Sequence, residues 1–226
     1  MQSAYHPDFG REVNYSFTAL PESADGQVRS TIHRIIRYIR IDACSPFIQD
    51  EARKMLSLGG GDPNLGVWNL LKPSMTFKND EKIAADLPVN DSRKEDTIEV
   101  LIRPIDQWTL IHLKGLGIGD CDCYHMYAGC LLYSLGIPCS LVTVAADNER
   151  PQEFSHVYLA SYWNGKRQAL DISHGQHPGW EAPSTRMKEW PIHVTLGEQL
   201  SDGALVLGGL SAVYFGFKWL VKERAA

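Results

Sequence analysis

"GDCDCYHMYAGCLLYSLGIPC" occupies residues 119–139 and organises the fold around it. Apolar side chains recur on most sides of this stretch, so we expect a buried helix that begins just after Asp120, which would lie near the N-terminal cap. Gly136 and Pro138 would end the helix. The sequence "CSLVTVA" at residues 139–145 then has the β-branched composition of a core strand.

A β-hairpin is predicted for residues 154–173, "FSHVYLASYWNGKRQALDIS". Its Asn-Gly pair is the strongest short-range hairpin signal, and a two-residue turn there pairs Trp163 with Lys166. Counting back along both strands sets His156 and Asp171 on one face as diagonal neighbours. We therefore expect their side chains to meet.

The chain upstream of this core is predicted to be mostly helical. Isoleucines at helical spacing, a Ser-Pro start signal and a Gly-Gly-Gly stop signal mark the successive elements. The expected elements are helices at about 28–39, 46–58 and 64–71, a solvated loop at 79–96, a strand at 97–103 ("TIEVLIR") and a short helix at 104–113.

Composition narrows the class of protein. The chain has 226 residues, of which 44% are hydrophobic and 22% charged, as is typical of one globular domain. A net charge of -5 argues against a nucleic-acid partner, which would need a concentrated basic face. The five cysteines are an odd number, and residues 2–11 lack the apolar core of a signal peptide. We therefore expect reduced thiols in a cytoplasmic or assembly-associated protein.

The cysteine at the start of the predicted helix is the candidate nucleophile. Cys121 would lie in the first turn, where unpaired backbone N–H groups and the helix dipole stabilise a thiolate. A nucleophilic thiol needs a base, and the hairpin supplies His156, with Asp171 placed to orient its ring. The pattern predicts a Cys-His-Asp triad.

These motifs resemble the transglutaminase-like superfamily. The resemblance rests on "GDCD" before an apolar helix, then "GIP" and a strand, "SHVYL", and "LD" after a short hairpin, and it covers residues 97–180 best. It implies an α+β fold with a papain-like core, in which N-terminal helices precede a nucleophile-bearing helix packed on an antiparallel sheet. It also implies Cys121 as nucleophile, His156 as base and Asp171 as orienting acid.

The resemblance carries further expectations about activity. The superfamily includes peptidases, amidases, transglutaminases and inactive members, and small members of this type resemble proteins of bacteria and their phages. We expect a thiol hydrolase that cleaves an amide bond of a peptide or protein, without metal or organic cofactor. The alternatives are a structural or virion-assembly protein that keeps the fold, and an amine-accepting transglutaminase.

Other positions are candidates for supporting roles. Many relatives carry an acidic residue where this chain has Cys123 and a small one where it has His125, so His125 is interpreted as a rim residue or a competing base. Gln107 is a candidate oxyanion donor together with the backbone N–H of Cys121. Trp180 is a candidate substrate contact at the rim.

A zinc site is the rival interpretation of the cysteine-rich helix. Cys121, Cys123, His125 and Cys130 would all come from one helix, on which residues 121 and 123 point to opposite sides, and no second Cys-x-x-Cys knuckle exists in the sequence. We therefore predict no metal site.

The C-terminus is predicted to form a separate element. Residues 1–200 would be the catalytic domain and 201–226 a hydrophobic helix, because residues 203–217 carry no charge and the apolar run continues to Val221 past Lys218. That length just reaches across a bilayer if Lys218 snorkels. A membrane or assembly anchor and an ordinary core helix are both compatible with it.

Overall fold

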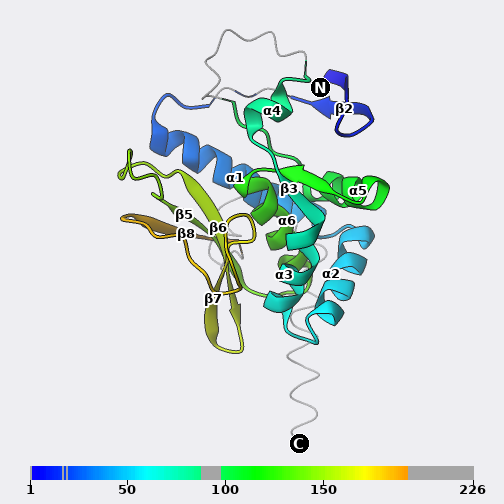
Figure 1. Cartoon of the computed structure of the whole chain (residues 1–226), viewed down its shortest axis with the longest axis vertical. Helices are drawn as coiled ribbons and strands as arrows, with labels where there is room; N and C mark the ends of the chain where they lie inside the picture. Colours follow the sequence, from blue (N-terminus) through cyan, green and yellow to red (C-terminus); the bar gives the residue numbers. More distant parts are fainter. Residues whose placement is uncertain (1, 17, 19, 88–97, 193–226) are drawn as a thin grey trace, which may run out of the picture. The chain divides into compact units, whose positions relative to one another are not determined.

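The computed structural model describes residues 2–16, 18, 20–87 and 98–192, and residues 1–193 form one compact unit. The architecture is α+β, with helices beside a four-stranded antiparallel sheet (Figure 1). The helices are α1 (Ala24–Asp42), α2 (Pro46–Leu58), α3 (Pro63–Ser74), α4 (Asp80–Ala84), α5 (Pro104–Lys114) and α6 (Cys121–Ser134). The strands are β1 (Gln2–His6), β2 (Arg11–Tyr15), β3 (Met75–Phe77), β4 (Gly117–Gly119), β5 (Cys139–Val144), β6 (His156–Trp163), β7 (Lys166–Leu170) and β8 (Met187–Pro191).

The four-stranded sheet has the order β7-β6-β5-β8. The predicted hairpin register is confirmed, because Trp163 pairs with Lys166 and Leu159 pairs with Leu170. Asn164 and Gly165 form the turn with φ of 51° and 73°, the positive values that a two-residue hairpin loop requires. Because β6 pairs with β5 on its other side, His156 begins a strand held from both edges.

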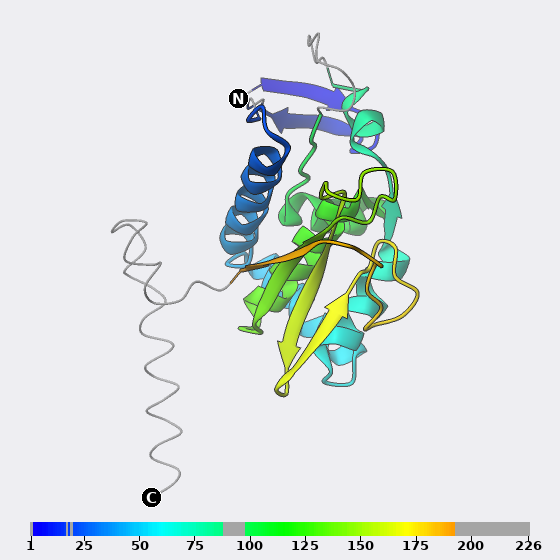
Figure 2. The ribbon, with the colours of Figure 1, turned by 90° about the vertical axis from the view of Figure 1, so that its left-hand side faces the viewer.

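The predicted buried helix is also confirmed as α6. It is buried continuously from Asp122 to Leu132 and packs against α1, α2 and the inner face of β5 and β6 (Figure 2). Gly129 allows this close approach, since a Cβ there would lie 3.0 Å from Ile39 Cδ1 and 3.3 Å from Leu159 Cδ1. Helix and sheet therefore share one hydrophobic core.

The predicted strand at 97–103 is wrong in the described part, residues 98–103, which form no regular structure. Their backbone bonds to a side chain instead of a neighbouring strand: Ile102 N–H donates to Cys123 Sγ at 3.4 Å, and the thiol donates to Val100 O at 3.3 Å. The alternation of apolar residues reflects burial of Ile102 against α6, and period-two patterning alone cannot tell that from a sheet.

Other predicted elements differ at their ends. α2 and α5 begin at the predicted prolines, whereas α3 continues through Pro73 to Ser74, and α4 occupies part of the predicted loop at 79–96. The polar N-terminus forms the hairpin β1–β2, which the sequence analysis did not anticipate. β3 and β4 pair in parallel, and β4 leads directly into α6.

The predicted C-terminal helix at 201–226, with its apolar run at 203–221, lies outside the described residues. Among the helices of the described ranges, none combines the length and the apolar character that a bilayer crossing requires.

Candidate active site

Cys121 is the first residue of α6. The N-cap is Asp120, as predicted, and its side chain accepts the backbone N–H of Cys123 at 3.5 Å. Gly119 makes the turn from β4 into the helix possible, because a Cβ at that position would lie 2.3 Å from the Cβ of Cys123. Cys121 keeps part of its surface open to solvent, whereas Cys123 and Cys130 on the same helix are buried.

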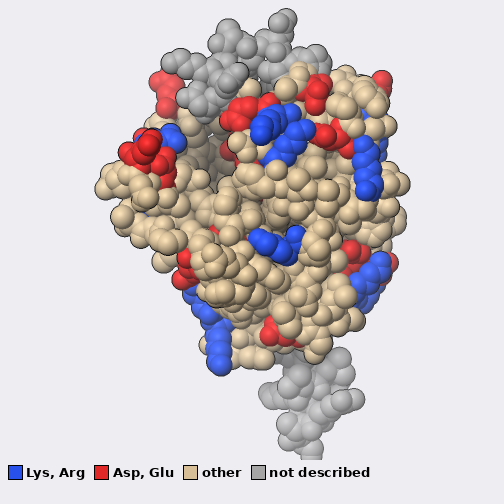
Figure 3. Space-filling view, in the orientation of Figure 1, with Lys and Arg blue, Asp and Glu red and all other residues tan. Residues whose placement is uncertain are grey.

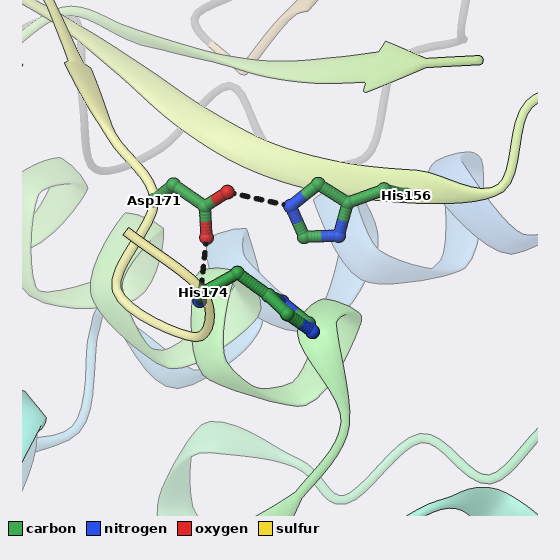
Figure 4. Close-up of side chains that lie close together, drawn as sticks. All are labelled: His156, Asp171 and His174. Carbon is green, nitrogen blue, oxygen red and sulfur yellow. Dashed lines mark hydrogen bonds and ion pairs between the residues drawn. The ribbon is translucent and has the colours of Figure 1, made fainter. Parts of the chain in front are cut away.

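His156 and Asp171 meet as the hairpin register predicts. His156 Nε2 lies 2.7 Å from Asp171 Oδ2, across the start of β6 and the residue that follows β7 (Figure 4). The other carboxylate oxygen, Oδ1, accepts the Ser173 hydroxyl and the His174 backbone N–H, each at 3.0 Å. The carboxyl group is fully buried and satisfied by donors on both oxygens.

These donors fix the charge of Asp171. Burial alone would raise its pKa, but the hydrogen bond from His156 and the nearby imidazole of His125 outweigh burial and hold the pKa of Asp171 well below its usual range. An ionised carboxylate accepts only, so His156 Nε2 carries a proton that it donates to Asp171, and Nδ1 points away from Asp171 (Figure 4).

The Cys121 sulfur lies beside the strand that carries His156. The backbone of Val157, the residue after His156, is near enough to the sulfur to lower the pKa of the thiol in part. Burial, followed by the charge of Asp120, nevertheless raises the pKa of the thiol well above its usual range. This direction is opposite to the thiolate stabilisation expected at a helix start, and a neutral thiol needs a base to become a nucleophile.

The turn that follows Asp171 is tied to α3. Lys72 Nζ donates to the Ile172 carbonyl at 2.9 Å and to the Gly175 carbonyl at 3.0 Å. Gly175 N–H in turn donates to the Asp171 carbonyl at 2.8 Å. A loop that carries a buried carboxylate is thereby held by an ammonium group from another element.

His125 lies beneath the site rather than at its rim. Its side chain is completely buried, so contact with a substrate at the surface, one of the expected roles, does not fit its position. Its ring stands at 83° to the ring of His156, with 6.2 Å between centroids. The expected helical spacing of four residues from Cys121 is correct, but it carries the side chain inward.

The remaining candidates have different surroundings. Gln107 is fully buried and clamps Ile118 in β4, accepting its N–H at 3.3 Å and donating to its carbonyl, so at most one amide N–H remains for an oxyanion. Trp180 is half-buried in the loop after β7. His174, in the same loop, is exposed, and its ring lies 4.8 Å from that of His156 and 5.0 Å from that of Phe77.

The cysteines of the rival zinc set are engaged separately. Cys123 bonds the backbone of residues 100 and 102, and Cys130 Sγ bonds the Ile39 carbonyl at 3.6 Å. Burial raises the pKa of both thiols well above the usual range. Both behave as packing residues, in line with the apolar character of buried cysteine.

Four groups of side chains in the described ranges have the spacing to hold a metal ion, and one of them consists of His6, Asp8 and Asp86. His156, Asp171 and His174 present ligand atoms within 4.8 Å of one another, although His156 and Asp171 already bond each other. Asp120 belongs to an acidic cluster with Asp122 and Cys123 on one side and with Asp80 and Glu99 on the other.

The acidic cluster was missed by sequence analysis. Asp80 and Asp122 are 8% and 4% exposed, and each has one buried oxygen without a hydrogen-bond partner. Burial first, then the charges of Asp120 and Glu99, raise the pKa of Asp80 to about 9 and that of Asp122 well above its usual range. The only available signal was the isolated glutamate in the apolar run at 97–103.

Comparison with models of known protein families gave no match, and comparison with curated proteins gave none either. On the face shown in Figure 3, basic side chains are scattered with acidic ones beside them, and they form no continuous basic surface there.

Proposed function

We propose that the protein is a thiol hydrolase that cleaves an amide bond, with Cys121 as nucleophile, His156 as base and Asp171 as the acid that orients His156. The observation that carries the proposal is the 2.7 Å hydrogen bond between His156 and Asp171, on a strand whose next residue, Val157, lies near the Cys121 thiol. A candidate nucleophile at a helix start, with a candidate base and acid on an antiparallel hairpin, fits the transglutaminase-like, papain-like core that the sequence resembles.

The proposed reaction uses only these side chains and water. The Cys121 thiol gives its proton to His156 Nδ1 as its sulfur bonds the carbonyl carbon, and the amine leaves with that proton when the C–N bond breaks. Water then attacks the thioester, passes a proton to His156, and releases the acid as the C–S bond breaks and the thiol is restored. Asp171 stays ionised and stabilises the imidazolium formed in each half.

The backbone N–H of Cys121 at the open end of α6 is the first candidate for stabilising the oxyanion. Gln107 has a single amide N–H left for that role. Exposed His174 lies against His156, and exposed Phe77 packs against His174, so both would border a bound peptide. These two side chains favour a substrate with an apolar or aromatic group near the scissile bond.

Alkylation with iodoacetamide at pH 7, read at each cysteine by peptide mass spectrometry, tests the proposal. Cys44 is exposed and serves as an internal reference for an ordinary thiol. We expect Cys121 to react at least about tenfold faster than Cys44, and the His156→Ala protein to lose that advantage. Reaction of Cys121 slower than Cys44, which burial alone would give, would contradict the proposal and favour a structural protein.

The acyl acceptor is tested separately. Once a peptide that acylates Cys121 is found in a substrate panel, primary amine is added and the products are identified by mass. Release of the free acid at a rate unaffected by the amine supports hydrolysis. Preferential formation of the amide would assign the protein to the transferases.

A further inference from the structure

His125 joins two pieces of backbone that are far apart in the sequence. Its Nδ1 lies 2.5 Å from the carbonyl oxygen of Cys121, and its Nε2 accepts the N–H of Ile172 at 3.0 Å. The first partner is the nucleophile candidate itself, and the second is the residue directly after Asp171. One buried imidazole thus spans the start of α6 and the end of the β6–β7 hairpin.

The two partners determine the state of the ring. A carbonyl only accepts and a backbone N–H only donates, so Nδ1 must carry the proton and Nε2 must be bare. Burial is the main reason that the pKa of His125 falls to about 4, and the nearby carboxylate of Asp171 opposes that fall only in part. The ring is neutral at neutral pH with both nitrogens occupied, so it is not the competing base considered from the sequence.

We propose that His125 is a positioning residue that holds Cys121 and Asp171 in register, an inference that rests on the proposed thiol hydrolase function. Asp171 receives His156 on one oxygen, so a shift of its backbone moves the imidazole as well. The ring of His125 also stands edge-on to the ring of His156, which limits the tilt of the base. An apolar side chain of similar volume at position 125 would leave the Ile172 N–H without a partner, and it would no longer link the start of α6 to the end of the β6–β7 hairpin.

The expected effect is a loss of base-assisted reactivity at Cys121. Misplacement of reacting groups by about 1 Å can cost on the order of 100-fold in rate. In His125→Leu we expect alkylation of Cys121 at pH 6.5 to fall at least about tenfold, toward the rate of His156→Ala, while the rate at the exposed Cys44 of the same protein is unchanged.

Two partial replacements separate the two hydrogen bonds. His125→Gln can place its amide oxygen where Nε2 accepts the Ile172 N–H, and His125→Asn can place its amide N–H where Nδ1 donates to Cys121. We expect either to restore part of the reactivity that His125→Leu loses. These variants also keep the inference testable if His125→Leu does not fold.

His6 offers a matched control. It is another buried histidine, 1% exposed, whose Nε2 lies 2.8 Å from the carbonyl oxygen of the distant residue Ile83 rather than from backbone next to the site. His6→Leu should reduce stability without moving the pH profile of Cys121 alkylation. Thermal unfolding of all variants provides the stability comparison.

The outcomes distinguish the two proposals. A profile shifted in His125→Leu but not in His6→Leu supports the positioning role. A normal profile in folded His125→Leu, or in both partial variants, overturns it and leaves the hydrolase proposal standing. If the unmodified protein shows no His156-dependent reactivity at Cys121, the hydrolase proposal fails and the positioning role fails with it.

Discussion

Replacing Asp171 with asparagine perturbs the proposed triad at its buried end. Asparagine keeps an oxygen to accept from Ser173 and His174, but it turns an NH₂ group toward His156 Nε2, where the carboxylate now accepts at 2.7 Å. Two donors cannot face each other, so the imidazole must move its proton to Nδ1. That nitrogen could then no longer take the proton of Cys121.

The loss of folding stability in Asp171→Asn follows from the hydrogen bonds that the carboxylate makes. A hydrogen bond to a charged group contributes about 1.5–3 kcal/mol, so we expect Asp171→Asn to lower the free energy of unfolding by about 2 kcal/mol at pH 7. The pKa of Asp171 is depressed in the folded protein, so its contribution is present above the unfolded-state value and is lost as pH falls through the folded value. The difference between the two proteins should shrink below pH 4.

The loss of reactivity should exceed what the loss of stability explains. In a serine triad the same exchange lowers kcat by about 10⁴-fold, and a thiol, which ionises more easily, should suffer less. The assay is the alkylation ratio of Cys121 to Cys44 at pH 7, with denaturant unfolding as the control. A folded Asp171→Asn protein with an unchanged ratio would refute the assignment of the acid.

Two further predictions concern the neighbourhood of Cys121. Because the pKa of Asp122 is raised in the folded protein, ionisation of this carboxyl destabilises the fold as pH rises. Asp122→Asn should therefore unfold at a higher temperature than the unmodified protein at pH 9 and at nearly the same temperature at pH 4. A variant that unfolds at a lower temperature at pH 9 would show that the charge of Asp122 is compensated in the fold. Gly119→Ala should lower the free energy of unfolding by about 3 kcal/mol or more, because the new Cβ would overlap the Cβ of Cys123. A free energy of unfolding within about 1 kcal/mol of the unmodified protein, measured with denaturant, would contradict this prediction.

Much of the scaffold of the site follows from local signals in the sequence. The Asn-Gly turn fixed the register that brings His156 to Asp171, because pairing in a two-residue hairpin leaves no freedom of alignment. The start of α6 followed from Asp120, whose short side chain can satisfy an N–H of the first turn. Both signals act over a few residues, and this is why they can be interpreted without a structure.

The missed features depend on contacts between distant segments. The apolar alternation at 98–103 is satisfied by Cys123 of α6 rather than by a strand, and no local pattern distinguishes the two. The orientation of His125 depends on Ile172, which lies 47 residues away, and spacing along one helix gave only its side of the helix. Asp80, at the start of α4, meets Asp120, the N-cap of α6, only in the folded chain, and no local pattern in the sequence links these two residues.

The place of the hairpin in the sheet order has a consequence for heat inactivation. β6 lies between two strands, whereas β7 pairs with β6 alone and its first residues are exposed. Fraying on warming should begin at such a margin, well before the molecule melts as a whole. Lys72 holds the loop after β7 to α3, so Asp171 should stay beside His156 while the exposed start of β7 frays, and the chemistry should persist until circular dichroism records the melting of the fold.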